Sequence, residues 1–245
     1  MSQPRVLLVE DDASIRRFVA MALEEDALDL VQAPTLAAAI DALRSGPFAL
    51  VLCDLMLPDG SGFDLLRSLA DADSPSPRAR RVAFSAGVSA LTRERLLALG
   101  VHEVLSKPVS VAALLDCVQR ALQAPAAAAT APPADMPAAP DPVTHFFGGN
   151  RPLYEAFAAQ CRQQWRQDVV QGDRAAAAAD LGALRRLAHS LKSVLQTLGL
   201  DADSALALDI ETSAAEGRAE TAQAQWQRLR QRLLAQGAAS TGAAG

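Results

Sequence analysis

Short apolar runs alternate with helical patterns over the first half of the chain. Each run has the length of a buried strand, and each is followed by a segment whose apolar residues recur with helical spacing. Alternation of this kind is typical of a parallel sheet with helices on both faces. The pattern predicts an α/β domain with five strands at Val6 to Val9, Leu28 to Val31, Phe48 to Cys53, Val82 to Phe84 and Val101 to Leu105.

The second half shows helical periodicity only. Four apolar stripes recur every three or four residues, and breaks at Gly172-Asp173, Gly199-Leu200-Asp201 and Glu216-Gly217 separate them. Short connections between four amphipathic helices predict an up-down four-helix bundle. The stripes are Phe157, Cys161, Trp165 and Val169; Leu184, Leu187, Leu191, Leu195 and Leu198; Ala205, Leu208 and Thr212; and Trp226, Leu229 and Leu233.

An Ala/Pro-rich stretch separates the two halves. Residues 123–142 contain almost no bulky apolar side chain, so we interpret them as a semi-extended linker. The Ala/Gly/Ser/Thr composition of residues 237–245 predicts a disordered tail. The predicted order is therefore an α/β domain over residues 5–122, the linker, a helical domain over residues 143–236, and the tail.

Composition narrows the classes of function. The net charge of -5 provides no basic field for a nucleic-acid backbone, so no nucleic-acid partner is predicted. The three cysteines are far apart in the sequence, which indicates neither a disulfide framework nor a zinc site and fits a reducing cytoplasm. No signal peptide and no apolar run near the ~20 residues of a membrane span is evident. We expect a cytoplasmic protein without membrane insertion.

Polar residues gather where the predicted strands end. The acids Glu10, Asp11 and Asp12 follow the first strand, Asp54 follows the third, Ser85 ends the fourth, and Lys107 with Pro108 ends the fifth. In an open parallel sheet, ligands bind at the carboxyl ends of the strands. Each residue alone is common in a turn, but together they predict one site.

Clustered carboxylates raise each other's pKa unless a cation lies among them. Because oxygen ligands suit a hard cation, Mg²⁺ is the natural candidate. Beside it, Asp54 could attack phosphorus as a carboxylate nucleophile and form an acyl phosphate. Lys107 would neutralise one phosphoryl oxygen and the Ser85 hydroxyl would bind another.

Four motifs of this first domain resemble the receiver domain of two-component response regulators. They are Leu7-Leu8-Val9-Glu10-Asp11-Asp12, the segment from Asp54 to Asp64, Phe84-Ser85-Ala86 and Ser106-Lys107-Pro108. The resemblance covers residues 5–122. It implies the flavodoxin-like fold, in which a doubly wound five-stranded parallel sheet is flanked by helices.

The resemblance also implies a role for each matching residue. Asp54 would be the phosphoacceptor, Asp11 a direct Mg²⁺ ligand, the Met56 backbone carbonyl another ligand, and Glu10 a ligand through water. Ser85 would be the switch hydroxyl, Lys107 the lysine that pairs with phosphate, and Pro108 would follow a cis peptide bond. Many receivers carry Tyr or Phe three residues before the lysine. Here that position is Val104, which casts doubt on an output through a rotating ring.

His189 has the most informative setting of the three histidines. On a helical wheel the leucine stripe lies opposite it, while Arg185, Arg186, Lys192 and Ser193 share its face. This places the imidazole in water among cations. Such a ring could attack phosphorus, and Lys192 one turn away would steady the product. The geometry leaves an idle surface histidine as the open alternative, whereas metal binding is disfavoured because no second ligand lies nearby.

The string from Leu187 to Ser193, followed by Leu198-Gly199, resembles the histidine phosphotransfer (HPt) domain, a four-helix bundle. The resemblance covers residues 143–236 and implies that His189 carries the phosphoryl group beside Lys192. Ser193 stands where glycine is frequent in that family, and a small residue there lets a partner receiver approach.

Together the two halves predict a two-component phosphorelay protein that transfers phosphoryl groups and is not a classical turnover enzyme. Its expected partners are a sensor histidine kinase, another receiver domain, or both. One alternative is a phosphorylation-gated receiver switch whose helical bundle only docks a protein. Another, with less support, is a magnesium-dependent phosphohydrolase that uses Asp54, although neither a second activating acid nor a substrate pocket is evident.

Overall fold

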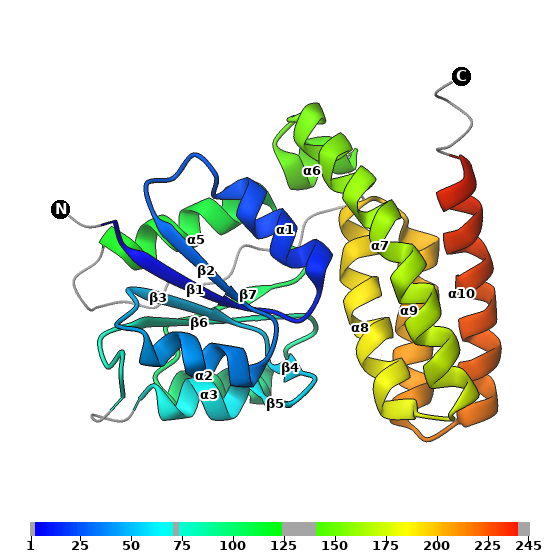
Figure 1. Ribbon diagram of the computed structural model, residues 1–245, viewed down its shortest axis with the longest axis horizontal. Coiled ribbons are helices and arrows are strands. Elements are labelled where there is room, and N and C mark those ends of the chain that lie inside the picture. Colours follow the sequence, from blue (N-terminus) through cyan, green and yellow to red (C-terminus); the bar gives the residue numbers. More distant parts are fainter. Residues whose placement is uncertain (1–2, 71–73, 124–140, 240–245) are drawn as a thin grey trace. The chain divides into compact units, whose positions relative to one another are not determined.

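The computed structural model describes residues 3–70, 74–123 and 141–239. These form two compact units, an α/β unit and a helical unit (Figure 1). Of the predicted linker at residues 123–142, residues 124–140 lie outside the described residues, whereas Gln123 ends one helix and Pro142 begins another. No helix in the described ranges is both long and apolar enough to cross a membrane.

The α/β unit follows the predicted alternation of strands and helices. Its elements are β1 (Arg5–Val9), α1 (Ala13–Ala22), β2 (Asp29–Ala33), α2 (Leu36–Arg44), β3 (Leu50–Cys53), β4 (Met56–Leu57), β5 (Gly60–Ser61), α3 (Gly62–Ser68), β6 (Arg80–Ser85), α4 (Ala90–Ala98), β7 (Glu103–Ser106) and α5 (Val111–Gln123). The five predicted strands are confirmed as β1, β2, β3, β6 and β7. The small antiparallel pair β4 and β5 is additional.

The main sheet is parallel throughout, with the strand order β2-β1-β3-β6-β7. The direction of winding reverses between β1 and β3, so the fold is doubly wound in the flavodoxin-like order, as predicted. Helices α1 and α5 cover one face, and α2 and α3 cover the other (Figure 1). In open α/β sheets ligands bind at such a reversal, beside the carboxyl ends of the strands, and here Glu10 and Asp54 follow β1 and β3.

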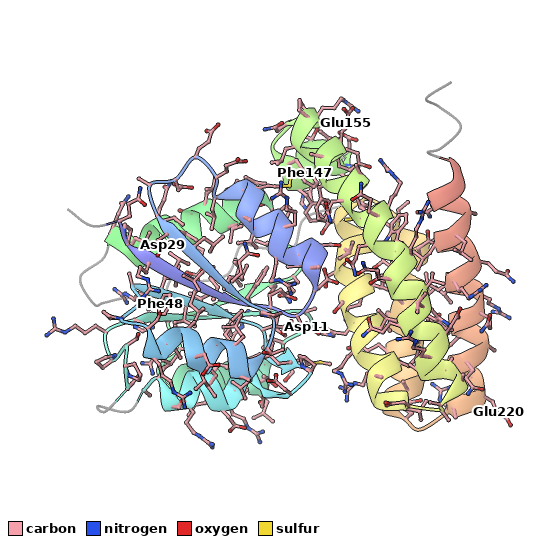
Figure 2. All side chains as sticks on the ribbon, viewed as in Figure 1. Asp11, Asp29, Phe48, Phe147, Glu155 and Glu220 are labelled. Carbon is pink, nitrogen blue, oxygen red and sulfur yellow. The ribbon has the colours of Figure 1, made fainter. Side chains whose placement is uncertain are left out.

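The central strands β1 and β3 are apolar on both faces because helices cover both. Along β1, Leu7 and Val9 join a buried cluster that also contains Leu65 of α3 and Leu96 of α4, which places α4 on the same face as α3. Val6 and Leu8, which alternate with them, are also fully buried. Asp11 lies at the opposite end of the sheet from Asp29 and Phe48 (Figure 2). The packed core therefore fixes the position of the sheet edge at which the acidic residues lie.

The helical unit is a four-helix bundle. Its helices are α7 (Arg151–Ala177), α8 (Leu181–Thr197), α9 (Asp201–Ala215) and α10 (Ala219–Ala239), and each packs against two neighbours in chain order, with α10 closing on α7. This confirms the predicted bundle and the breaks near Gly199 and Gly217. A short helix that was not predicted, α6 (Pro142–Phe147), precedes it.

The predicted break at Gly172-Asp173 is wrong, because α7 continues to Ala177. Gly172 has a packing role instead: a Cβ atom there would lie 2.0 Å from the Trp226 ring. Asp173 accepts a hydrogen bond from the Trp226 indole at 3.0 Å and one from Arg230 at 2.8 Å. The glycine therefore allows α10 to approach α7 closely at this point.

The predicted stripe on the third helix is also wrong. Ala205, Leu208 and Thr212 are exposed, whereas Ala207, Ile210 and Ala214 form the buried face of α9. Asp203 is buried too, paired with Arg232 and Gln236 of α10. Apart from Ile210, the buried residues of α9 are small or polar, so apolar bulk did not reveal its register. At the C-terminus, α10 passes the predicted domain end at Gln236 and reaches Ala239, and residues 240–245 lie outside the described part.

Candidate functional site

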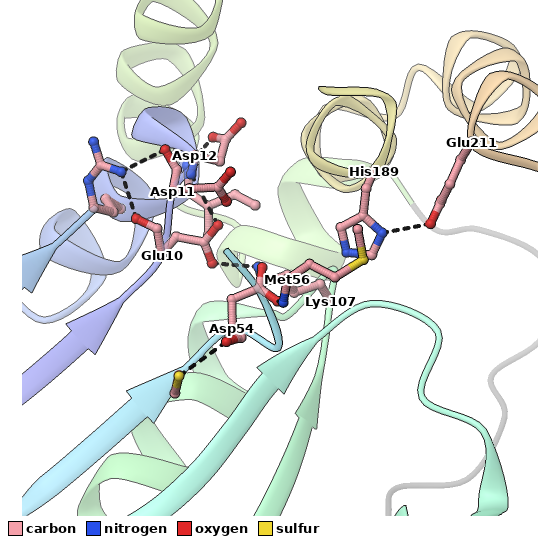
Figure 3. A network of polar contacts seen from close by, with 11 residues as sticks. Glu10, Asp11, Asp12, Asp54, Met56, Lys107, His189 and Glu211 are labelled. Atoms are coloured by element: carbon pink, nitrogen blue, oxygen red, sulfur yellow. Dashed lines mark hydrogen bonds and ion pairs between the residues drawn. The ribbon is translucent and has the colours of Figure 1, made fainter. Parts of the chain in front are cut away.

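Three acids converge at the carboxyl edge of the sheet (Figure 3). Glu10, Asp11 and Asp54 each offer a carboxylate oxygen, and these oxygens lie within 4.8 Å of one another. Glu10 and Asp54 are buried, and Asp11 is partly buried. Asp12, the fourth predicted acid, turns away to cap α1, where its side chain accepts the Ile15 amide at 2.8 Å. The predicted acidic site therefore forms from two strand ends.

Lys107 links the two buried acids. Its Nζ donates to Glu10 Oε2 and, at 2.5 Å, to Asp54 Oδ2. The same ammonium lies 4.8 Å from the centre of the Phe84 ring, a favourable cation–π distance. The Lys107–Pro108 peptide bond is cis, as the resemblance implied. This lysine therefore faces the Asp54 carboxylate from the end of β7.

The acids remain electrostatically unbalanced despite this lysine. Burial, and then the Asp54 charge, raise the pKa of Glu10 well above its usual value against the opposing effect of Lys107. Burial and the Asp54 charge also raise the pKa of Asp11 to about 6. The pKa of Lys107 is raised because its two carboxylate partners outweigh the effect of burial. Oxygen donors that resist ionisation together fit a divalent cation.

Hydrogen bonds to or from the backbone hold the acidic loop and the Asp54 carboxylate. Arg16 donates to the carbonyls of Glu10 at 2.7 Å and Asp11 at 2.8 Å. The Met56 amide donates to Asp54 Oδ1 at 3.0 Å, which fixes the carboxylate on the side away from Lys107. Arg16 was not predicted from the sequence. Its spacing from Glu10 and Asp11, one turn into α1, was the available signal.

Ser85 ends β6 at this same edge and is buried. Among the described residues its hydroxyl makes no hydrogen bond to the acids. Val104 of β7 is buried in the hydrophobic core. It occupies the position, three residues before the lysine, at which many receivers carry an aromatic ring. The structure thus brings Glu10, Asp11, Asp54 and Lys107 into direct proximity and places Ser85 at the same edge of the sheet.

The second predicted site centres on His189 in α8. We expected its ring in water, but the residue is 5% exposed. The helical wheel failed because it ignores the neighbouring helix: Glu211 of α9 reaches the ring, and its Oε1 lies 2.8 Å from His189 Nδ1 (Figure 3). Ser193, one turn further along α8, is likewise buried.

Glu211 binds Lys192 as well, through Oε2 at 2.6 Å. Burial alone would raise the pKa of Glu211, but the hydrogen bonds from His189 and Lys192 outweigh it and lower that pKa to about 2. At neutral pH Glu211 is therefore ionised and can only accept hydrogen bonds.

The hydrogen bond to Glu211 determines which ring nitrogen of His189 keeps its lone pair. Because the carboxylate can only accept, Nδ1 carries the proton, and in the neutral ring Nε2 keeps its lone pair. Within the described ranges, Nε2 has no hydrogen-bond partner. This is the arrangement that a nitrogen nucleophile requires. Glu211 was missed from the sequence because it lies 22 residues beyond His189.

Comparisons with known proteins agree with this geometry. The family model for the response regulator receiver domain matches residues 6–119, and the model for the Hpt domain matches residues 154–239. The receiver protein CpdR of Brucella abortus is 31% identical over 119 residues, which cover 96% of CpdR and 48% of this chain. The chain belongs to the response regulator receiver family. It combines a receiver domain with an Hpt domain.

Other relatives share the receiver domain within longer proteins. The sensor protein ArcB of Escherichia coli is 37% identical over 116 residues, which make up 47% of this chain and 15% of ArcB. The response regulator PilR of Pseudomonas aeruginosa is 32% identical over 123 residues, which cover 50% of this chain and 27% of PilR. Among solved structures, the HemR receiver domain of Leptospira biflexa is 31% identical with a TM-score of 0.47, and the match covers 52% of this chain and all of that one. The chain spans only part of ArcB and PilR.

Proposed function

We propose that this protein is a phosphorelay component that accepts a phosphoryl group on Asp54 and carries or exchanges one on His189. The main support for this proposal is that one polypeptide holds two side chains that could each accept a phosphoryl group. One is a carboxylate among acids and a lysine, and the other is an imidazole whose Nδ1 is bound by Glu211 while Nε2 has no partner in the described part of the chain.

At the receiver site, Asp54 Oδ1 is held by the Met56 amide and Oδ2 by Lys107. Asp11, Asp54 and the Met56 carbonyl would hold Mg²⁺ directly, and Glu10 would hold it through water. When bound, the ion neutralises charge on the transferring phosphoryl group. Lys107 would pair with one phosphoryl oxygen and the Ser85 hydroxyl would donate to another. Asp54 then attacks phosphorus, and the bond to the donor's histidine nitrogen breaks.

At the Hpt site, the lone pair on His189 Nε2 attacks the phosphorus of an aspartyl phosphate. The new N–P bond forms as the O–P bond breaks, and the electron pair returns to the aspartate carboxylate. Glu211 accepts the hydrogen bond from Nδ1–H throughout, and its negative charge balances the positive charge that develops on the ring. Lys192 shares Glu211 with His189, and we propose that its ammonium group neutralises phosphoryl oxygens.

The partners we propose are a sensor histidine kinase, another receiver domain, or both, as the two domain types imply. The cytoplasm is the proposed location. Cys53, Cys117 and Cys161 form no disulfide in the structure, which fits a reducing compartment. We propose no nucleic-acid partner, consistent with the net charge of -5.

The alternative, a bundle that only docks a partner, has less support because the Hpt match covers the bundle and Glu211 leaves one nitrogen of His189 available. Acetyl phosphate with Mg²⁺ tests the receiver half directly. We expect base-labile label on the wild type and none on Asp54→Asn. Label of equal yield on Asp54→Asn would contradict the assignment of Asp54.

A further inference from the structure

Asp59 sits at the tip of the small hairpin that follows Asp54. The hairpin pairs Met56 with Ser61 and Leu57 with Gly60, which leaves Pro58 and Asp59 in the turn. Asp59 is exposed, and neither the acidic cluster nor the proposed chemistry uses it.

The Asp59 carboxylate binds the start of α2, a helix 23 residues earlier in the sequence. Its Oδ1 accepts the Leu36 amide at 2.8 Å, and its Oδ2 accepts the Ala37 amide at 2.9 Å. Thr35 caps the next amide, that of Ala38, at 3.1 Å. All three amides would otherwise be without intrahelical partners, and a negative charge here is favoured by the helix dipole. The hydrogen bonds from Ala37 and then Leu36 lower the pKa of Asp59, so it stays ionised at neutral pH.

Packing supports the same contact. Gly60 lies so close to α2 that a Cβ atom there would be 2.5 Å from Leu36 Cδ2. The opposite end of the hairpin meets the nucleophile: a Cβ atom at Gly62 would lie 1.8 Å from the Asp54 carbonyl oxygen, and the Met56 amide binds Asp54 Oδ1. Asp54 thus holds the base of the hairpin, at Met56 and Gly62, and α2 holds its tip, at Asp59 and Gly60.

We infer that Asp59 is a positioning residue for the proposed Mg²⁺ site, because it anchors the hairpin that carries the Met56 carbonyl to the N-terminus of α2. The buried side chain of Leu57 anchors the hairpin as well, but apolar packing is not directional. The two hydrogen bonds of Asp59 fix the tip in position and orientation. The inference rests on the proposed function, since it concerns the ligand set proposed there.

Thr35 provides a matched control. Thr35→Ala removes a cap from the same helix end without touching the hairpin, so it isolates the effect of weakening α2. Asp59→Ala removes both the cap and the anchor. Asp59→Asn keeps one acceptor oxygen and can therefore retain one of the two hydrogen bonds. Thermal unfolding of the three variants reports how far each destabilises the fold.

The experiment is a calorimetric titration of the full chain with MgCl₂. Partners that orient metal ligands typically contribute about 10–100-fold to affinity. We expect Asp59→Ala to raise the dissociation constant about tenfold and Asp59→Asn about threefold. We expect Thr35→Ala to stay within about twofold of the wild type. Amide exchange at Met56 should quicken in Asp59→Ala and not in Thr35→Ala.

An unchanged dissociation constant in both Asp59 variants would overturn the inference. Equal weakening by Thr35→Ala would overturn it too, because the effect would then come from α2 stability. If Asp59→Ala does not fold, the comparison of Asp59→Asn with Thr35→Ala decides. A wild type that neither binds Mg²⁺ nor takes label from acetyl phosphate would instead refute the proposed function itself.

Discussion

Oε1 of Glu211 lies 2.8 Å from Nδ1 of His189 and joins two helices of the bundle at the proposed phosphoryl carrier. The same carboxylate binds Lys192 through its other oxygen. One residue thereby sets the tautomer of the histidine and the position of the lysine. Four predictions follow from these contacts and from those of the acidic cluster and the interface between α7 and α10.

Glu211→Ala should slow phosphoryl transfer to His189. The variant loses a hydrogen bond to a charged group, which contributes about 1.5–3 kcal/mol, so we expect transfer about 10–100-fold slower. Glu211→Gln keeps an acceptor oxygen and should lose less. Rapid-quench transfer from a phosphorylated receiver measures the rate. Asp209→Ala, which removes an exposed acid from the same helix, is the control. An undiminished rate in Glu211→Ala would exclude this role.

Acid should destabilise the bundle through Glu211. Its pKa is lowered from 4.5 to about 2 in the folded protein, so its contribution is present above pH ~4.5 and is lost as the pH falls toward 2. We expect a loss on the order of 2 kcal/mol across this window, absent in Glu211→Gln. The only two tryptophans, Trp165 and Trp226, are both in the bundle, so fluorescence in urea reports its unfolding alone. Identical pH dependence in the two proteins would refute the prediction.

Asp11→Asn should stabilise the receiver domain in the absence of Mg²⁺. Burial and the Asp54 charge raise the pKa of Asp11 from 3.8 to about 6, so ionisation of Asp11 destabilises the fold as the pH rises through this range. At pH 7.5 we expect a gain of about 1 kcal/mol, or roughly 4 °C in the midpoint. Calorimetry of the full chain measures it, with tryptophan fluorescence identifying the bundle's transition.

The same variant should lose most of the stabilisation that Mg²⁺ gives the wild type, because it lacks one proposed ligand. A variant less stable than the wild type in EDTA, or one stabilised equally by Mg²⁺, would contradict the role given to Asp11.

Gly172→Ala should destabilise the bundle. The added Cβ atom would lie 2.0 Å from the Trp226 ring, so the helices must separate, at a cost of about 1–3 kcal/mol. Gly237→Ala is the matched control, because a Cβ atom there meets nothing within 4 Å. It should be neutral or slightly stabilising, as alanine favours helix. Urea unfolding followed by tryptophan fluorescence distinguishes them; equal stability of the two variants would refute the packing role of Gly172.

The sequence predicted the receiver fold well because its determinants are local. The central strands β1 and β3 are continuous apolar runs, and the polar groups of the site lie at or just after the ends of strands. Once β1 and β3 are adjacent, Glu10 and Asp54 meet at the sheet edge without further information. Lys107 could be assigned to the site from its place at the end of β7 alone.

The contacts that sequence reasoning missed are those between elements. His189 appeared exposed because a wheel drawn for α8 omits Glu211 on α9. The register of α9 was misjudged because alanine, serine and aspartate surround Ile210 on its buried face, and from sequence alone Asp203 cannot be told from a surface acid. Gly172 was predicted to end a helix. The sequence alone does not distinguish a glycine that makes room for a packed tryptophan from a glycine that ends a helix. Asp59 resembled an ordinary turn residue until α2 was placed beside it.

Phosphate mapping tests the central claim most directly. The wild type, Asp54→Asn and His189→Gln would each be exposed to a radiolabelled sensor kinase and, separately, to a labelled partner receiver, with Mg²⁺ present. We expect acid-labile phosphohistidine on the wild type and on Asp54→Asn when a labelled receiver is the donor, and none on His189→Gln. With the kinase as donor we expect a base-labile acyl phosphate on the wild type and on His189→Gln, and none on Asp54→Asn. Label that is absent from both residues under every donor, or that persists in both variants at other residues, would contradict the account.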